Sequence, residues 1–330
     1  MNKPQIVVIT GATAGVGRAT ALEFARRGAD VALIGRDEHA LEETAADVRA
    51  LGVRALALSA DVSATGALDD AAAQVEAKLG PIDVWVNNAM VTAFAPFAEM
   101  SEADFKRITD VTYLGFVWGT MAALKRMAPR DQGVIVQVGS ALAYRSIPLQ
   151  SAYCGAKHAI RGFTDSLRCE LLHAKSRIHL TMVQMPALNT PQFDWAKCEL
   201  PHAPRPVAPI YDPEVAAHAI YWSATHRRRE LWVGAPSIKA IVANMLFPGL
   251  LDRYLGRTGY DAQQDPSLAS SGRPSNLWEP VSALHRVRGR FEQRSQHASP
   301  MLWVDTHRGL LVSGALVFAA CLACASRRRS

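Results

Sequence analysis

Tyr153 and Lys157 stand four residues apart in the stretch SAYCGAKHAI, which is otherwise small and apolar. Residues i and i+4 of a helix lie on one face, about 5–6 Å apart at Cβ. An ammonium favours the ionised form of a neighbouring phenol and so brings its pKa of about 10 closer to neutrality. The spacing therefore indicates a general acid/base, with an ordinary exposed pair on a helix surface as the alternative.

A glycine-rich segment supplies a second chemical feature. Gly11, Gly15 and Gly17 lie between an apolar run, QIVVIT (5–10), and a segment with helical spacing. Glycines suit a place where the chain turns tightly and a diphosphate approaches the backbone, while the amides at the following helix start point at that anion. Ordinary strand-to-helix turns also use glycine, but the position at the start of a strand–helix series favours a dinucleotide site.

The end of the second predicted strand bears on the choice of dinucleotide. In such folds a basic residue there accommodates the 2′-phosphate of NADP, and an acidic one accepts from the 2′-hydroxyl of NAD. The strand over 30–35 is followed by Arg36 and then Asp37. Arg36 favours NADP(H), and Asp37 leaves NAD(H) open.

The elements that must position these residues alternate between strand and helix. Strand-like runs occupy 5–10, 30–35, 53–61, 83–89 and 133–140, helical spacing lies between them, and a last strand is expected over 230–236. A long helix is expected over 101–127, with Ser101 and Asp104 as a capping box at its start. This alternation predicts an α/β fold with a doubly wound parallel sheet of the Rossmann type.

Five motifs in a fixed order give the chain a resemblance to the classical short-chain dehydrogenases/reductases over about residues 4–236. The matching segments are TGATAGVG (10–17), DVS (61–63), NNA (87–89), VGS (138–140) and YCGAK (153–157). The resemblance implies that Tyr153 is the general acid in carbonyl reduction and the base in the reverse direction. It also implies that Lys157 tunes that phenol and grips the nicotinamide ribose, and that Ser140 hydrogen-bonds the substrate oxygen.

The same resemblance implies further cofactor contacts. Asp61 would contact the adenine, Asn87 would pack behind the cofactor loop, and Pro186 and Thr190 would touch the nicotinamide carboxamide. Three positions depart from the family pattern: Thr112 stands for the fourth catalytic residue, an Asn, and Met90 and Ala187 stand for common glycines. A threonine hydroxyl is shorter than an amide, so the family's proton relay through water would be altered or rebuilt here.

The C-terminal part has a different character. We expect a catalytic NADP-binding domain over 1–236, a partly irregular extension over 237–306, in which 260–300 is an extended wrap or partly disordered, and an apolar helix with a basic end over 307–330. Residues 309–325 carry no charge and reach the lower limit of about 17–25 residues for a membrane span. A membrane anchor is favoured over a buried terminal helix. The apolar stretch 238–251 suits a membrane surface or a roof over the substrate site.

Composition restricts the partners. The net charge is +6, and residues 285–330, with eight Arg and two acidic residues, hold the whole excess, so the neutral main body indicates no nucleic-acid partner. The five Cys show no metal-ligand spacing in the main body, and no metal is expected. No signal peptide is expected, so the globular part is predicted to face the cytoplasm and to be membrane-associated through 309–325.

These features predict an NADP(H)-dependent oxidoreductase that interconverts a carbonyl and an alcohol on a hydrophobic small molecule. The alternative is a catalytically weak nucleotide-binding scaffold or sensor at a membrane, which the departures at Thr112 and Met90 would suit. The family often pairs subunits through its long helices, so the resemblance also implies a homo-oligomer.

Overall fold

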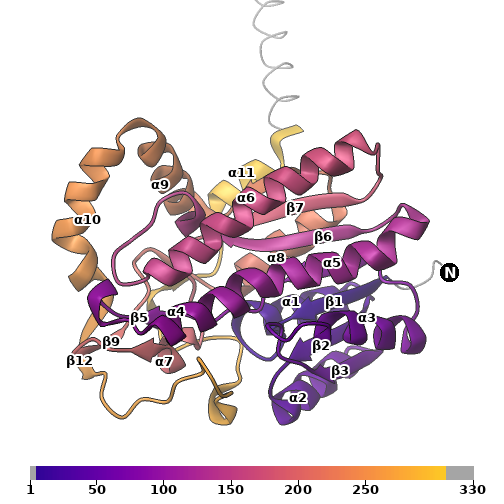
Figure 1. Ribbon diagram of the computed structural model, residues 1–330, viewed down its shortest axis with the longest axis horizontal. Helices are drawn as coiled ribbons and strands as arrows, with labels where there is room; N and C mark the ends of the chain where they lie inside the picture. The colour runs from indigo at the N-terminus through magenta and orange to yellow at the C-terminus, as the bar shows by residue number, and fades with distance from the viewer. Residues whose placement is uncertain (1–4, 310–330) are drawn as a thin grey trace, which may run out of the picture.

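A seven-stranded parallel sheet forms the centre of the protein (Figure 1). The computed structural model describes residues 5–309. The strand order is β11-β7-β6-β4-β1-β2-β3, so the order reverses between β1 and β4, where open α/β sheets bind their ligands. The strands are β1 (Ile6–Thr10), β2 (Asp30–Gly35), β3 (Ala55–Ser59), β4 (Val84–Asn87), β6 (Val134–Ser140), β7 (His179–Met185) and β11 (Glu230–Trp232).

Helices cover both faces of this sheet, as its apolar strands require. Val7 and Ile9 of β1 pack with one layer of helices, while Ile6 and Val8 pack with the other, and all four side chains are fully buried. The first layer is α1 (Gly15–Arg26), α2 (Glu38–Arg49) and α8 (Pro213–Thr225). The second is α3 (Ala67–Lys78), α5 (Gly115–Met127) and α6 (Ser151–His173). The predicted doubly wound Rossmann-type fold is confirmed.

Three local predictions differ from the structure. The last strand, expected over 230–236, spans only Glu230–Trp232, because a helix, α9 (Gly234–Leu246), begins directly after it. Strand β7 was not predicted, because the buried polar residues Thr181 and Gln184 interrupt its apolar pattern. The helix expected over 101–127 is two helices, α4 (Glu102–Thr109) and α5, joined by a π-helical turn over Asp110–Leu114. Its predicted cap is present, since the Ser101 hydroxyl accepts from the Asp104 amide at 3.1 Å.

The chain beyond β11 continues on the structure rather than away from it (orange to yellow in Figure 1). Two helices, α9 (Gly234–Leu246) and α10 (Pro248–Ala262), form a hairpin, and α11 (Pro300–Thr306) packs on α9. Between them the chain is an extended wrap, one of the two alternatives expected for residues 260–300.

Two short strand pairs connect this wrap to the catalytic part: β9 (His202–Pro204) with β12 (Gln264–Ala269), and β10 (Ile210–Tyr211) with β13 (Ser295–Gln296). A third pair, β5 (Ala93–Phe94) with β8 (Lys197–Cys198), lies within the catalytic part, where β8 follows the short helix α7 (Gln192–Trp195). Within residues 5–309 no helix is long and apolar enough to cross a membrane. The anchor predicted over 309–325 lies, from residue 310 on, outside the described residues.

Candidate active site

A cavity of about 500 Å³ opens at the carboxyl ends of the sheet strands. Its volume is in the range of small-molecule and cofactor sites. Most of the residues predicted for catalysis and cofactor binding line it: Gly11, Gly15, Arg36, Asp61, Ser140, Tyr153, Lys157, Pro186 and Thr190. Gly17, Asn87 and Thr112 were also predicted for this site, but they do not line the cavity.

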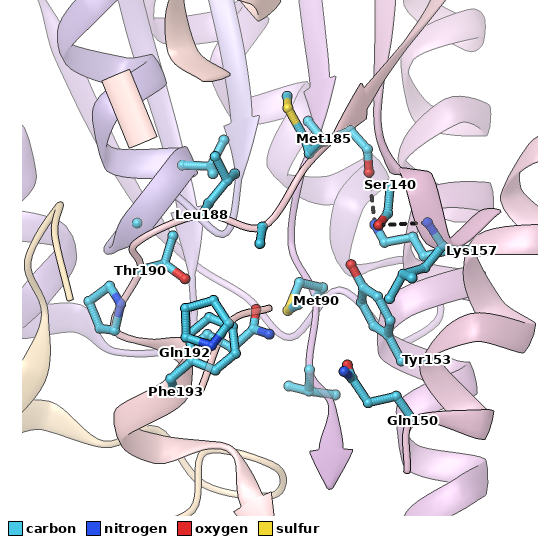
Figure 2. Close-up of a pocket in the computed structure, with 18 of the residues that line it drawn as sticks. Met90, Ser140, Gln150, Tyr153, Lys157, Met185, Leu188, Thr190, Gln192 and Phe193 are labelled. Carbon is cyan, nitrogen blue, oxygen red and sulfur yellow. Dashed lines mark hydrogen bonds between the residues drawn. The ribbon is translucent and has the colours of Figure 1, made fainter. Parts of the chain in front are cut away.

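Ser140, Tyr153 and Lys157 converge at one end of this cavity (Figure 2). Ser140 is the last residue of β6, and the other two lie on the first turns of α6, so the close contact of strand end and helix start brings them together. Figure 2 shows the Tyr153 hydroxyl directed at the Ser140 side chain. All three side chains are buried, with residue exposures of 8%, 9% and 2% respectively.

The pKa values of Tyr153 and Lys157 differ from the expectation that the ammonium lowers the pKa of the phenol. Burial raises the pKa of Tyr153 above that of a free phenol, and only the Ser140 hydroxyl opposes the rise. The Lys157 ammonium donates to the Val138 carbonyl at 2.8 Å and lies 5.5 Å from the Tyr153 ring centre. Burial lowers the pKa of Lys157 to about 7. In the protein alone, desolvation therefore outweighs the expected effect of the ammonium on the phenol.

The glycine segment forms a cradle that side chains would fill. Gly11 has φ +66°, and a Cβ on it would lie 2.7 Å from the Ala89 Cα. A Cβ on Gly17 would lie 2.0 Å from the Gly11 carbonyl oxygen, and one on Gly15 would lie 3.1 Å from Thr190. Gly17 does not line the cavity itself, but its missing side chain allows α1 to pack directly against the Gly11 backbone. This tight, side-chain-free turn before α1 fits a dinucleotide diphosphate.

The asparagine that supports this cradle is Asn88, which sequence reasoning missed. Its side-chain Nδ2 donates to the carbonyls of Thr10 and Gly11 at 3.0 and 3.1 Å, and the residue lines the cavity. The predicted residue, Asn87, is the fully buried last residue of β4, and its side chain donates to Thr120 and Gln137. Strand β4 is buried on both faces, so no polar–apolar alternation indicated which of the two asparagines faces the site.

Charged residues line the opposite end of the cavity. The Arg36 guanidinium donates to the carbonyls of Trp278 and Asn276 at 2.7 and 2.6 Å. One Asp37 oxygen caps α2 through the Ala40 amide at 2.9 Å. Burial alone would raise the pKa of Asp61, but hydrogen bonds from Arg107 and Ser63 outweigh it and hold this pKa below its usual range.

Thr112 lies behind the cavity wall. Its hydroxyl donates to the Val91 carbonyl at 2.8 Å and accepts from the Val91 amide at 3.1 Å, and the side chain is fully buried. It sits in the π-helical turn, so this turn presents the hydroxyl to the segment that carries Met90. The hydroxyl thus uses both its donor and its acceptor. Met90, the neighbour of Val91 in the chain, lines the cavity (Figure 2).

The remaining walls come from the loop after β7 and from the extension. Leu188, Thr190 and Phe193 form the wall opposite Tyr153 in Figure 2. Helix α10 roofs the space, and its end is fixed because Gln150 donates to the Gln263 side chain at 2.7 Å. The lining is mainly apolar, with polar groups at the Ser140–Tyr153–Lys157 cluster and at the opposite end, around Arg36 and Asp61. Among the described residues, no group of three His, Cys, Asp or Glu side chains is placed to hold a metal ion.

The fold and the site define a class: a Rossmann-type oxidoreductase that uses a nicotinamide cofactor. Residues 5–197 match the family model described as short chain dehydrogenase. The chain therefore belongs to the short-chain dehydrogenase/reductase family.

Several relatives place the chain within this family. It is 32% identical over 285 residues to the uncharacterized oxidoreductase YxnA of Bacillus subtilis, covering 86% of this chain and 80% of that protein. It is 36% identical over 167 residues to human estradiol 17-beta-dehydrogenase 11, and 32% identical over 192 residues to 3-dehydrosphinganine reductase of Danio rerio. These two matches cover about half of each chain, 51% and 57% of this one and 56% and 57% of the relatives.

A solved structure agrees with this placement. A short-chain dehydrogenase from Streptomyces avermitilis superposes with a TM-score of 0.66 at 25% identity, over 79% of this chain and 98% of that one.

Proposed function

We propose that the protein is an NADP(H)-dependent oxidoreductase that interconverts a carbonyl and an alcohol on a hydrophobic substrate, with Tyr153 as the general acid/base. One observation carries the proposal: Ser140, Tyr153 and Lys157 meet inside an apolar cavity that continues to the glycine cradle. A nicotinamide cofactor bound along that cavity supplies or accepts the hydride. The side chains of the protein transfer the proton, hold the substrate oxygen and stabilise the charge that develops on it.

Tyr153 would move the proton. Because burial raises its pKa, the hydroxyl is protonated near neutral pH and is ready to donate to a carbonyl oxygen during reduction. Ser140 would hold that oxygen beside the phenol and stabilise the charge that develops on it. Lys157, anchored on the Val138 carbonyl, would stabilise the phenolate left behind and grip the nicotinamide ribose. The catalytic role first expected for Thr112 becomes a supporting one, because its hydroxyl is bonded to Val91.

The preference for NADP(H) over NAD(H) is supported by the groups at the end of β2. Arg36 lines the cavity and brings a positive charge to the position where a 2′-phosphate would lie. Asp37, which would serve the 2′-hydroxyl of NAD, uses one oxygen to cap α2 and is 8% exposed. Measuring the dissociation constants of NADPH and NADH for wild type and Arg36→Leu tests the preference, which should largely disappear in the variant.

A hydrophobic substrate suits the apolar walls of the cavity and its roof. Two relatives carry names that denote acting on a steroid and on a sphingoid lipid, estradiol 17-beta-dehydrogenase 11 and 3-dehydrosphinganine reductase. Membrane association is part of the proposal. It is supported by the uncharged sequence over 309–325 and by the tip of the α9–α10 hairpin, which exposes five large apolar side chains: Met245, Leu246, Phe247, Leu250 and Tyr254.

We also propose a homo-oligomer paired through the long helices. Exposed apolar side chains lie on each of α4, α5 and α6, at Phe105, Met121 and Leu172. Light scattering during size-exclusion chromatography would give the mass, and a monomer at micromolar concentration would contradict this part.

The first experiment labels the unknown product. Purified protein is mixed with NADPH deuterated at nicotinamide C4, on both faces, and with a total lipid extract. Mass spectrometry then searches for molecules that gain one deuterium. The same mixture with Tyr153→Phe is the comparison, and Tyr221→Phe is the matched control, since Tyr221 packs on Phe24 away from the cavity.

A deuterated product with wild type and Tyr221→Phe, lowered about 10²- to 10⁴-fold with Tyr153→Phe, is the expected result. Binding of NADPH without any Tyr153-dependent label would instead favour the scaffold or sensor.

A further inference from the structure

The side chain of His285 is buried, with an exposed fraction of 7%. Neither ring nitrogen makes a well-formed hydrogen bond among the described residues, although the Thr13 backbone lies close enough to raise the pKa of the ring. It lines the active-site cavity, with its ring packed on Trp195 and its Nε2 3.6 Å from an Asp37 oxygen. A buried polar group without a partner destabilises the protein unless a ligand or water completes its bonding.

The segment that carries His285 lies directly on the elements that form the adenosine half of the dinucleotide site. The Gly15 amide, at the start of α1, donates to the Arg286 carbonyl at 2.9 Å, and Arg18 donates to the His285 carbonyl at 2.9 Å. The Arg36 guanidinium donates to two further carbonyls of the segment. These four bonds join the segment to the start of α1 and to the end of β2.

Both ends of this segment are fixed to the loop after β7. At one end, the Asn276 amide donates to the Trp195 carbonyl at 2.9 Å, and the next residue, Leu277, is fully buried in the core. At the other end, the Gly289 amide donates to the Asn189 carbonyl at 3.0 Å. A Cβ on Gly289 would lie 2.5 Å from the Thr190 carbonyl oxygen, so only glycine allows this close approach.

We propose that residues 276–289, here called the cofactor strap, close the outer side of the dinucleotide site, and that His285 hydrogen-bonds the bound dinucleotide. The inference rests on the proposed function, because it takes the ligand to be a nicotinamide dinucleotide. The strap lies outside residues 5–197, which the family model matches. It adds a binding residue and a wall that the family's motifs do not contain.

The chemistry of His285 suits a ribose hydroxyl or a phosphate ester oxygen. Burial lowers the pKa of His285, so near neutral pH the ring carries one nitrogen that donates and one that accepts. The charged groups around it are Arg18, Asp37 and Glu43. A dinucleotide held beneath the strap leaves only after the hydrogen bonds of the strap with Gly15, Arg18 and Arg36 break, so its dissociation is slow.

The test measures cofactor binding directly, with the full chain and with NADPH and NADH as probes. Calorimetry gives the dissociation constants, and stopped-flow fluorescence gives the dissociation rates. His285→Ala removes the hydrogen bonds, and His285→Gln keeps a donor and an acceptor. His218→Ala is the matched control, because His218 is an exposed histidine on α8, outside the cavity.

We expect His285→Ala to weaken binding of the preferred dinucleotide about 3- to 10-fold, mostly through faster dissociation, with His285→Gln near wild type and His218→Ala unchanged. A lower Tm of His285→Ala with unchanged binding would overturn the assignment and leave His285 a packing residue.

A second measurement remains decisive if His285→Ala fails to fold. Hydrogen–deuterium exchange on wild type should show residues 276–289 more protected when NADPH is bound, and Gly289→Ala should speed dissociation by displacing the strap. Equal exchange with and without bound NADPH would overturn the strap while leaving the proposed function intact. Wild type that binds neither dinucleotide would overturn both, whereas binding without Tyr153-dependent turnover would overturn the proposed function alone.

Discussion

The ammonium of Lys157 is a buried ionisable group whose pKa burial lowers strongly. Burial lowers its pKa from 10.5 to about 7, so between these values the folded protein binds fewer protons than the unfolded chain. The free energy of unfolding therefore rises with pH through this window, by up to about 1.4 kcal/mol per pH unit, and this contribution is constant below about pH 7.

Urea unfolding of the cofactor-free protein at about pH 7, 8 and 9 measures this slope. We expect wild type to gain stability over that range relative to Lys157→Met, in which the titrating group is absent. The comparison with the variant cancels other groups, including the buried thiol of Cys154, whose pKa is raised by burial. Parallel pH dependences would contradict a desolvated Lys157.

The residue scale also shows which side chains the sequence could identify. Tyr153 and Lys157 were found from their spacing of four residues on a helix, and Ser140 from the resemblance of VGS (138–140) to the family motif. Asn88 was missed in favour of Asn87, because burial on both faces of β4 removes the alternation that would separate them. His285 could not be found, because nothing in its local sequence indicates that it lies over the glycine cradle, 270 residues earlier in the chain.

At the scale of the elements, the π-helical turn between α4 and α5 positions the side chain of Thr112. It directs the Thr112 hydroxyl at both backbone groups of Val91, next to Met90 in the cavity wall. Thr112→Val would leave a buried amide and a buried carbonyl unpaired, and we expect a loss of about 1–3 kcal/mol in the free energy of unfolding.

Thr112→Ser keeps the hydroxyl and loses one methyl group, which is expected to cost no more than about 1 kcal/mol. Denaturant titration of both variants measures the difference, and substrate turnover by Thr112→Ser should stay near wild type. A Thr112→Val protein of unchanged stability would show that Val91 finds other partners.

The turn from β1 into α1 leaves no space for a side chain, so a substitution there tests directly whether the glycine cradle binds the dinucleotide. Gly17→Ala places a Cβ 2.0 Å from the Gly11 carbonyl oxygen, which must displace the cradle. We expect dinucleotide binding, measured by calorimetry, to fall at least about tenfold while circular dichroism still shows a folded protein.

Gly162→Ala in α6 is its matched control, since a Cβ there meets no atom within 4 Å. That variant should bind normally and be slightly more stable, because alanine is the better helix former. Normal binding by Gly17→Ala would contradict the assignment of the cradle.

Element boundaries were predictable where the sequence carries local signals. Strand β2 was expected over 30–35 and is observed there, and the Ser101 cap fixes the start of α4. The break between α4 and α5 has no such signal, since neither proline nor glycine lies within Asp110–Leu114. The contacts of the extension were not predictable, because most of the bonds that hold it run to backbone carbonyls, which every residue has.

At the scale of the whole molecule, the proposed membrane association has a direct test. The full chain should float with lipid vesicles, deletion of residues 310–330 should reduce the floated fraction, and Phe247→Ser with Leu250→Ser should reduce it further. The tip side chains are 57% and 61% exposed and would be buried in the lipid surface.

Phe97→Ser with Leu51→Ser is the matched control, since these residues are 71% and 41% exposed but lie outside the α9–α10 hairpin and outside the proposed subunit contact. This pair should leave flotation unchanged. A full chain that stays at the bottom of the gradient would contradict the proposal.

The cofactor strap is synthesised long after the glycine cradle on which it packs. Gly15 leaves the ribosome about 270 residues before Arg286, whose carbonyl later accepts from its amide. At roughly 5–20 residues per second, this separation lasts ~14–54 s, and N-terminal parts of a chain generally fold first. The glycine cradle is therefore exposed during translation, and a dinucleotide that binds the nascent chain is enclosed when the last part of the chain arrives.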